Sequence, residues 1–305
     1  MTDFTVVTKG LRFPEGPIAL PNGEFLVVEV AAGTLARVAA DGTISVAATT
    51  GGGPNGAAIG PDGACYICNN GGLKTIQMGD LLLPDETPED TAPGSIQRVD
   101  LNTGAVTTLY AHSEKTPFWG PNDLVFDNDG GFWFTDFGRL HDRYQHRGSL
   151  YYAKADGSYI EEVVHPMEMA NGVGLSPDGK SLYVAETFTS QVWRFELDGP
   201  GRIKRSAHGN GGTVIGRAGP NQFLDSLAVD SANNVCVASP GGGGIMVFAG
   251  DGSAQHHIPM SDFMTTNICF GGPDLRTAYI TLATTGQLVS VPWPHAGVKL
   301  NYLNK

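Results

Sequence analysis

A short sequence motif recurs six times along the chain, and this repetition constrains the fold more than any other feature. Each copy has a polar residue, a short apolar run, a turn rich in Pro, Asn, Asp and Gly, and a second apolar run. Asn171-Gly-Val-Gly-Leu-Ser-Pro-Asp-Gly-Lys followed by Ser-Leu-Tyr-Val-Ala is a clear example. Turn chemistry of this kind between two β-rich runs predicts a hairpin. The opening polar residues, called the heads below, are Glu15, Asn55, Asn122, Asn171, Asp225 and Thr266.

The spacing of the copies predicts a β-propeller. Repeats of roughly 40 to 50 residues are typical of propellers and solenoids. The first five copies continue into two further strand-like runs, so each forms a four-stranded antiparallel unit, the composition of a propeller blade. The fourth strands are expected at residues 43–48, 105–111, 159–165, 203–208 and 254–259.

The sixth copy has three strand-like runs and lacks a fourth. The chain supplies a spare run, Phe4–Lys9, before the first repeat. A ring that takes its last outer strand from the N-terminus closes without an unpaired edge. We therefore expect an all-β fold: a single six-bladed β-propeller domain over residues 1–305, with four antiparallel strands per blade and the last blade closed by the N-terminal strand.

Composition supports this fold and excludes some functions. The 42 glycines and 19 prolines are spread over turn positions, as many short strands require. A formal charge of −12 disfavours binding to nucleic acid or to an acidic membrane. The start resembles no leader peptide and no apolar run reaches membrane-spanning length, so we expect a cytoplasmic monomer or small homo-oligomer.

The four cysteines are expected to be small buried hydrophobic residues. Cys65 and Cys68 have the two-residue spacing of a metal-binding or redox pair. They lie, however, in the strand-like run Ala-Cys-Tyr-Ile-Cys, where an odd offset directs two side chains to opposite faces.

Two segments exceed the repeat. Residues 71–94 contain Met-Gly-Asp-Leu-Leu-Leu-Pro and an acidic, proline-rich remainder, and residues 139–147 contain Leu-His-Asp-Arg-Tyr-Gln-His. Long excursions on a propeller face often serve as lids or specificity loops. A solvated or oligomer-packing loop is the alternative, and the sequence leaves both interpretations open.

The heads are candidates for a metal site. The innermost strands of a propeller ring its central channel, so equivalent residues of successive blades converge on the axis. Two carboxylates among amide oxygens form the negative, oxygen-rich donor set that a hard divalent cation prefers. Asn and Asp before a strand can also cap a turn through side-chain hydrogen bonds. Turn capping does not explain all six heads, however, because every head is polar and Glu, present at position 15, is uncommon in turns. We expect one divalent cation, with calcium as first choice and Mg, Mn, Zn or Fe(II) as alternatives.

Four motifs spread over the chain resemble those of one family. They are Phe13-Pro-Glu-Gly-Pro, Gly120-Pro-Asn-Asp-Leu, Asn171-Gly-Val-Gly-Leu-Ser-Pro-Asp-Gly and Asp225-Ser-Leu-Ala-Val-Asp. In this order they resemble the senescence marker protein/gluconolactonase family, the six-bladed propellers that include regucalcin and bacterial sugar lactonases. The resemblance implies a divalent metal held by Glu15, Asn171 and Asp225, with Asn122 either joining that set or touching substrate.

The resemblance also implies a reaction. The metal would polarise the carbonyl group of a lactone and lower the pKa of a bound water, and Asp225 is the candidate for handling the proton of the attacking water. A metal-dependent lactonase is therefore the leading interpretation. A phosphotriesterase branch has a similar ligand set, so an organophosphate or other ester hydrolase is one alternative. A metal-binding or partner-binding scaffold without turnover is another.

Two positions depart from the family pattern. Ser226 stands where Gly commonly follows the metal aspartate, and Gly120 stands where sugar-binding members can carry Arg. The second departure disfavours a simple aldonolactone, whereas Phe118, Trp119 and Leu81–Leu83 suggest a partly apolar pocket. The residues expected to bind substrate are Asn55, Asn70, Trp119, Asn122 and Glu186.

A second ring and three histidines complete the candidates. The residues that end the second strands are Asn70, Asp136, Glu186 and Ser239, and buried structural bonding is the alternative role for them. The candidate acid or base groups His112, His141 and His146 lie in loops whose positions the sequence does not determine.

Overall fold

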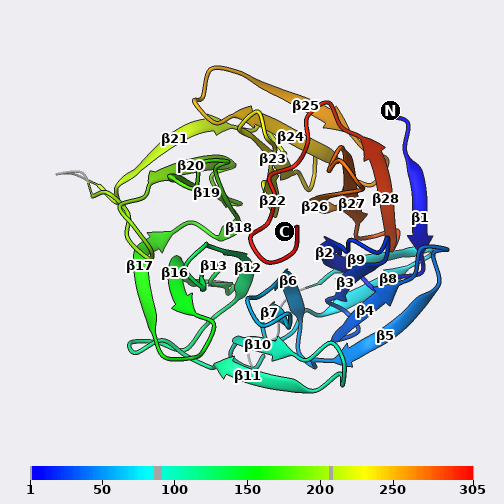
Figure 1. Cartoon of the computed structure of the whole chain (residues 1–305), viewed down its shortest axis with the longest axis horizontal. Coiled ribbons are helices and arrows are strands. Elements are labelled where there is room, and N and C mark those ends of the chain that lie inside the picture. Colours follow the sequence, from blue (N-terminus) through cyan, green and yellow to red (C-terminus); the bar gives the residue numbers. More distant parts are fainter. Residues whose placement is uncertain (1, 86–90, 206–208, 305) are drawn as a thin grey trace.

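The computed structural model of the protein describes residues 2–85, 91–205 and 209–304. Six four-stranded antiparallel sheets surround a central axis in this part of the chain (Figure 1). The first strand of each sheet lies innermost and the last lies outermost. The prediction of an all-β, six-bladed propeller is therefore confirmed. No helix among the described residues is long and apolar enough to cross a membrane.

From the axis outward the strands are, in blade 1, β2 (Pro14–Ala19), β3 (Phe25–Glu29), β4 (Thr34–Val38) and β5 (Ile44–Thr49); in blade 2, β6 (Pro54–Ile59), β7 (Cys65–Asn69), β10 (Ser95–Val99) and β11 (Val106–Tyr110); in blade 3, β12 (Pro121–Phe126), β13 (Gly131–Asp136), β16 (Gly148–Lys154) and β17 (Ile160–Met167); in blade 4, β18 (Ala170–Leu175), β19 (Ser181–Glu186), β20 (Gln191–Glu196) and β21 (Gly212–Arg217); in blade 5, β22 (Leu227–Val229), β23 (Asn234–Ala238), β24 (Gly244–Ala249) and β25 (Gln255–Pro259); and in blade 6, β26 (Thr265–Gly271), β27 (Thr277–Leu282), β28 (Gln287–Pro292) and β1 (Thr5–Lys9).

The N-terminal strand completes the last blade, as predicted. β1 pairs antiparallel with β28, in a register that places Thr5 opposite Ser290. The side chains of Phe4 and Val7, both partly buried, pack against the apolar cores on either side of this sheet. β1 therefore covers an edge of blade 6 that would otherwise be open to pairing with another chain.

Removal of residues 2–9 is expected to lower the midpoint of thermal unfolding by roughly 5–10 °C, because two packed apolar side chains and a row of ladder hydrogen bonds are lost. The uncovered edge of β28 should also promote self-association. Calorimetry and light scattering measure the two effects, with Val6→Ser as control because Val6 is already exposed. An unchanged midpoint after truncation would show that the strand is dispensable.

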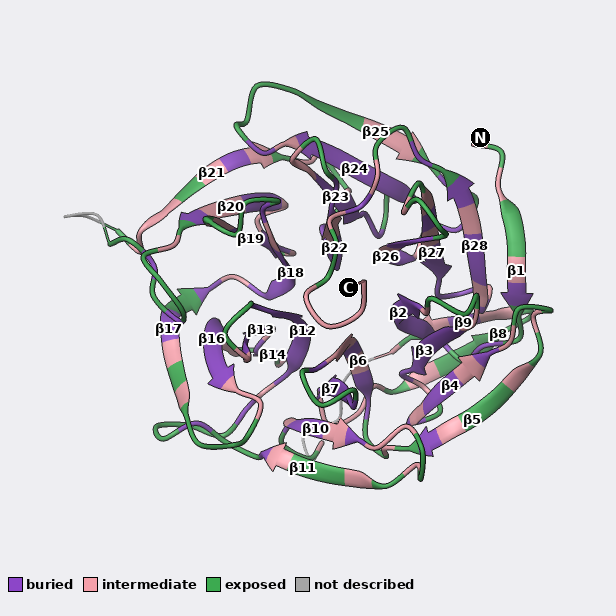
Figure 2. Ribbon diagram, in the orientation of Figure 1, coloured by how far each residue is buried: buried purple, intermediate pink, exposed green. Residues whose placement is uncertain are grey.

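Burial decreases with distance from the axis (Figure 2). β3, β7 and β13 are buried along their whole length, because both faces of a second strand pack against neighbouring blades. The outer strand β5 is largely solvent-facing. Cys65 and Cys68 accordingly lie in different core clusters, and all four cysteines are free, with Cys269 only partly buried.

The fourth strand of blade 4 lies later in the chain than predicted. The expected strand at residues 203–208 is wrong, since Ile203 forms only an isolated bridge with Leu197, and residues 206–208 lie outside the described residues. Lys204 and Arg205 offer no alternating apolar face, so they suit a loop better than a strand. The chain pairs again at β21, where Ile215 is buried in the core.

The two excursions each contain a small hairpin. β8 (Thr75–Met78) pairs with β9 (Leu81–Pro84), and β14 (Arg139–Leu140) pairs with β15 (Gln145–His146). Leu82 of the first hairpin is buried beside Phe13 of blade 1 and Ala283 of blade 6. This part of the excursion is therefore packed on the propeller, while residues 86–90 lie outside the described residues.

The C-terminal segment, residues 293–304, crosses the channel (Figure 1), and its hydrogen bonds reach the last residues of β12 and β22, at the end opposite the heads. The N–H of Val298 donates to the carbonyl oxygen of Val229 at 2.9 Å. The side-chain amide of Asn301 donates to the carbonyl oxygen of Phe126 at 2.7 Å. This segment, which the repeat pattern did not predict, links blade 5 to blade 3 across the axis.

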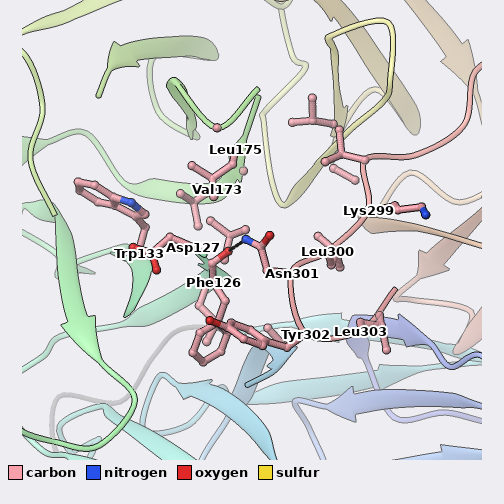
Figure 3. A pocket seen from close by; sticks show the side chains of 18 of the residues that line it. Phe126, Asp127, Trp133, Val173, Leu175, Lys299, Leu300, Asn301, Tyr302 and Leu303 are labelled. Carbon is pink, nitrogen blue, oxygen red and sulfur yellow. Dashed lines mark hydrogen bonds between the residues drawn. The ribbon is translucent and has the colours of Figure 1, made fainter. Parts of the chain in front are cut away.

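A cavity of about 420 Å³ lies between this C-terminal segment and the inner strands (Figure 3). Most of its lining is apolar and includes Val173, Leu175 and Leu300. Asp123 and Asn267, each of which directly follows a head, also line it. The cavity therefore reaches the layer just below the heads.

Candidate metal centre

The heads occupy equivalent places at one end of the channel, which we call the head face. Five of them stand second in the first strand of their blade, and Asp225 stands two residues before β22. The pairing of the first two strands is irregular beside each of these five heads. Such a bulge bends a strand and redirects a side chain. The bulge explains how the side chain of a head can take a direction that regular strand pairing would not give it.

Glycines after the heads allow neighbouring inner strands to approach closely. A Cβ atom at Gly16 would lie 2.4 Å from the carbonyl oxygen of Asn55, and one at Gly172 would lie 2.7 Å from that of Asp225. No side chain fits at such distances, so glycine is required at both positions. The backbones of heads in adjacent blades therefore touch.

Three carboxyl groups share this region, of which Glu15 and Asp123 are buried and Asp225 is partly exposed. Two are the heads Glu15 and Asp225, and the third is Asp123, which the sequence analysis missed. Burial raises the pKa of Glu15 to about 7 and the pKa of Asp123 to about 7, and the charge of Glu15 adds to the second shift. Burial and the charges of Glu15 and Asp123 raise the pKa of Asp225 well above its ordinary value. Protons or a cation are needed to neutralise such a set.

Hydrogen bonds fix two of these carboxylates in place. Oε2 of Glu15 accepts the side-chain amide of Asn267 at 2.8 Å. Oδ1 of Asp123 accepts the N–H of Leu124 at 2.9 Å, and its Oδ2 accepts the N–H of Val173 at 3.4 Å. A signal for Asp123 was present in the sequence, because the residue after the head is Gly in three copies and an acid only here.

The amide heads carry oxygen atoms without partners. The side-chain oxygens of Asn55, Asn122 and Asn171 are buried and accept no hydrogen bond from the described residues. The amide nitrogen of Asn171 donates to Oγ1 of Thr187 at 3.1 Å, which orients the amide. An unpaired buried oxygen costs about 1–3 kcal/mol, so a bound cation or a hydrogen-bond donor from a ligand would stabilise each of the three.

This donor set fits a hard divalent cation. Carboxylate and amide oxygens are the ligands that calcium accepts, and carboxylates supply the balancing charge. In the described parts of the chain, no three His, Cys, Asp and Glu side chains form a metal-binding group, so the amide oxygens would be essential. The sixth head, Thr266, hydrogen-bonds to the carbonyl oxygen of Pro14 and to the hydroxyl group of Thr281 instead.

The predicted second ring holds the backbone around the heads. Asp136 accepts the N–H groups of Trp119 and Gly120 at 2.9 and 2.8 Å. Glu186 accepts the N–H of Glu168 at 2.8 Å. Each carboxylate thereby fixes the segment two or three residues before the head of its own blade. Buried structural bonding, the alternative role for these residues, accounts for both.

The same arrangement recurs in blades 1 and 2. Glu29 accepts the N–H of Arg12, and Asn69 accepts an N–H two residues before its head. Asn70, the predicted ring residue, lies one place further along, and its side-chain oxygen accepts the N–H of Gly72 at 2.9 Å. Asn70 and Glu186 stay predicted substrate contacts, although both side chains already have protein partners.

Trp119 lies in an aromatic cluster with two of the candidate histidines. Its ring stacks on His146, with the centroids 3.5 Å apart. Nδ1 of His146 lies 3.2 Å from Nε2 of His141, which brings the two histidines of the second hairpin into contact. Burial, with the charges of His141 and Arg139, lowers the pKa of His146. His112 is separate and exposed.

Arg139 joins the stems of the two excursions. Its buried guanidinium donates to the carbonyl oxygens of Thr91, Ala92 and Trp119 at 2.9, 3.1 and 2.9 Å. Phe118, which was expected near a pocket, is instead fully buried against Phe134 and Tyr151. Trp119 is therefore the partly exposed aromatic residue of this segment.

Relatives named lactonase drp35 match part of the chain. That of Staphylococcus epidermidis is 32% identical over 193 residues, which cover 61% of this chain and 50% of the relative. That of Staphylococcus haemolyticus is 37% identical over 131 residues, which cover 42% of this chain and 38% of the relative. The matched regions thus span half or less of these relatives.

Solved structures share the fold at low sequence identity. A gluconolactonase from Xanthomonas campestris superposes with a TM-score of 0.74 at 22% identity, covering 95% of this chain and 89% of that chain. Regucalcin from Agrobacterium tumefaciens, described as a calcium-binding protein, gives 0.77 at 18% identity, covering 100% and 98%. A family model described as the SMP-30/gluconolactonase/LRE-like region matches residues 13–284. This match covers most of the chain, which therefore belongs to the SMP-30/gluconolactonase/LRE-like family, as its motifs predicted.

Proposed function

We propose that the protein is a divalent-cation-dependent lactonase whose site is the ring of heads. The observation that carries the proposal is the set of unpaired oxygens of Asn55, Asn122 and Asn171 together with the carboxyl groups of Glu15 and Asp225, whose pKa values are both raised. Relatives named lactonase and gluconolactonase, and a neighbour described as calcium-binding, support the reaction and the cation.

The heads would bind the cation and the substrate. Glu15, Asn122, Asn171 and Asp225 would hold the cation, and the free oxygen of Asn55 is available to the cation or to substrate. A cation held there supplies positive charge where negative charge develops on the lactone carbonyl oxygen. Calcium is the first choice for such oxygen donors, with Mg, Mn, Zn or Fe(II) as alternatives.

Asp225 would move the proton. Water adds to the carbonyl carbon while Asp225 takes one of its protons, and the ring C–O bond then breaks. The proton passes to the departing alkoxide oxygen, so the product is a hydroxy acid and no other reactant is needed. A cation beside Asp225 favours its ionised form and makes it a weak base, so the lowering of the water pKa by the cation would supply most of the activation.

Chelation followed by cation addition tests the proposal on a panel of lactones assayed by acid release. Activity should disappear with the cation and return when calcium is added. Glu15→Gln should raise the calcium concentration for half-maximal activity by roughly 10–100-fold, because it removes a charge from the donor set. Glu24→Gln is the control, since Glu24 is a carboxylate of the same blade that pairs with Arg37 at the end of β2 remote from Glu15.

Each alternative has its own outcome. Calcium binding without hydrolysis of any lactone would favour the scaffold interpretation. Turnover of organophosphates or simple esters in preference to lactones would favour the other hydrolase. Lactone hydrolysis that survives complete chelation would contradict the dependence on a cation.

A further inference from the structure

The two faces of the propeller differ in the apolar side chains that they expose. The large apolar side chains exposed on connections of the head face are, within the described residues, Ile76, Met78, Leu140, Tyr144, Phe188, Phe223 and Phe263. Those exposed elsewhere are Val6, Val46, Tyr159 and Leu300. Scattered apolar residues on a surface need no explanation, but a gathering around one site does.

Four aromatic residues lie especially close to the heads. Trp119 precedes the head Asn122 by three residues, Phe223 precedes Asp225 by two, and Phe263 precedes Thr266 by three. Three residues of backbone span at most about 10 Å, so these rings are carried by connections that start close to the heads. Phe188 is the fourth, and the four are called the aromatic collar below.

Phe188 is linked to the heads by the hydrogen bonds of its neighbour Thr187. Thr187 accepts the amide of the head Asn171 and donates to the carbonyl oxygen of Leu224 at 2.7 Å. The turn that carries Phe188 is thus bonded both to a head and to the connection that leads to Asp225. The side chain of Phe188 is nevertheless 47% exposed.

Phe223 and Phe263 flank a turn that has no side chains of its own. The N–H of Phe223 donates to the carbonyl oxygen of Pro240, and the N–H of Gly241 donates to the carbonyl oxygen of Phe263. Residues 241–244 are all glycine, so this turn adds no side chain of its own, although the side chain of Gln222 lies against Gly242. Both rings are more than 40% exposed and remain available for an apolar ligand.

We propose that the aromatic collar binds an apolar substituent of the substrate, so that the preferred lactones carry an alkyl or aryl chain rather than several hydroxyl groups. This inference rests on the proposed function. Hydroxyl groups of a sugar lactone would lose hydrogen bonds to water against phenyl rings. An alkyl chain would gain free energy there from apolar surface removed from water. The open heads bind the polar ring of the lactone, and the collar selects what is attached to it.

A series of γ-lactones from γ-butyrolactone to γ-decanolactone tests the proposal, with gluconolactone as the polar comparison. Full burial of one methylene is worth about fourfold, so half-exposed rings should raise kcat/KM by about twofold for each added carbon. Replacing Phe188, Phe223 and Phe263 together by Ser should flatten this dependence, and replacing them by Leu should keep most of it. Val46→Ser, on the outer strand β5, is the matched control.

The ratio of long-chain to short-chain kcat/KM within each variant is the readout, so a general loss of activity does not imitate the effect. No hydrolysis of any lactone would overturn the proposed function. Hydrolysis with no dependence on chain length, or with a preference for gluconolactone, would overturn the collar alone. A wild type that self-associates through these rings, shown by a monomeric Ser variant with an unchanged chain-length ratio, would also overturn it.

Discussion

Lactone hydrolysis by Asp225→Asn is expected to fall by about 10²–10⁴ relative to wild type when both proteins are saturated with calcium. The substitution keeps an oxygen donor of similar size and removes the group that takes the proton of the attacking water. Asp225 also contributes charge to the cation, so calcium should bind more weakly and turnover must be compared at saturation. Stopped-flow or pH-stat assays on a short-chain lactone measure the effect.

Asp123→Asn provides the matched comparison. Asp123 is a buried carboxylate of the same group, but it bonds the backbone of Leu124 and Val173 and lines the cavity on the far side of the heads. We expect a smaller loss than for Asp225→Asn. If Asp225→Asn keeps turnover within about threefold while Asp123→Asn abolishes it, Asp123 is the base. If neither matters, His141 and His146 are the groups to replace next.

The repeat made most of the fold predictable from sequence. A polar head, an apolar run and a turn, which is Asp-Gly or Asn-Gly in four of the copies, specify a hairpin locally, and six four-stranded units of this kind are typical of a propeller. The missing fourth strand of the sixth unit and the spare strand Phe4–Lys9 then specified how the ring closes. The prediction failed in blade 4, where a loop of irregular length separates β20 from β21 and periodicity gives no signal.

The site was less predictable, because its decisive features arise between blades. The heads could be named from their repeated position, and their neighbours such as Thr187 could not. Asp123 was missed because it follows a head, and only contact between adjacent inner strands brings it beside Glu15. The role of Asp136 and Glu186 in bonding the backbone likewise depends on which connection lies against the end of the second strand.

Stability of the cation-free protein is expected to fall as the pH rises from about 5 to 8. Burial raises the pKa of Glu15 from 4.5 to about 7, so the folded state binds a proton that the unfolded state releases in this interval. The stabilisation from this proton is complete below pH 4.5 and is lost as the pH rises through 7. One such group corresponds to about 3 kcal/mol, or roughly 5 °C or more in the unfolding midpoint.

Calcium should reverse this dependence. A bound cation replaces the protons and stabilises the ionised carboxylates, so the midpoint with calcium should exceed the cation-free midpoint far more at pH 8 than at pH 5.5. Thermal unfolding at both pH values, with calcium or with chelator, measures the difference. Glu15→Gln should make the cation-free profile less steep, because Asp123 and Asp225 remain, whereas Asp251→Asn should leave its slope unchanged, because Asp251 is exposed. A cation-free midpoint that stays constant or rises from pH 5.5 to 8 would mean that the carboxylates of the head ring are already neutralised by other groups, and the need for a cation at this site would lose its electrostatic basis.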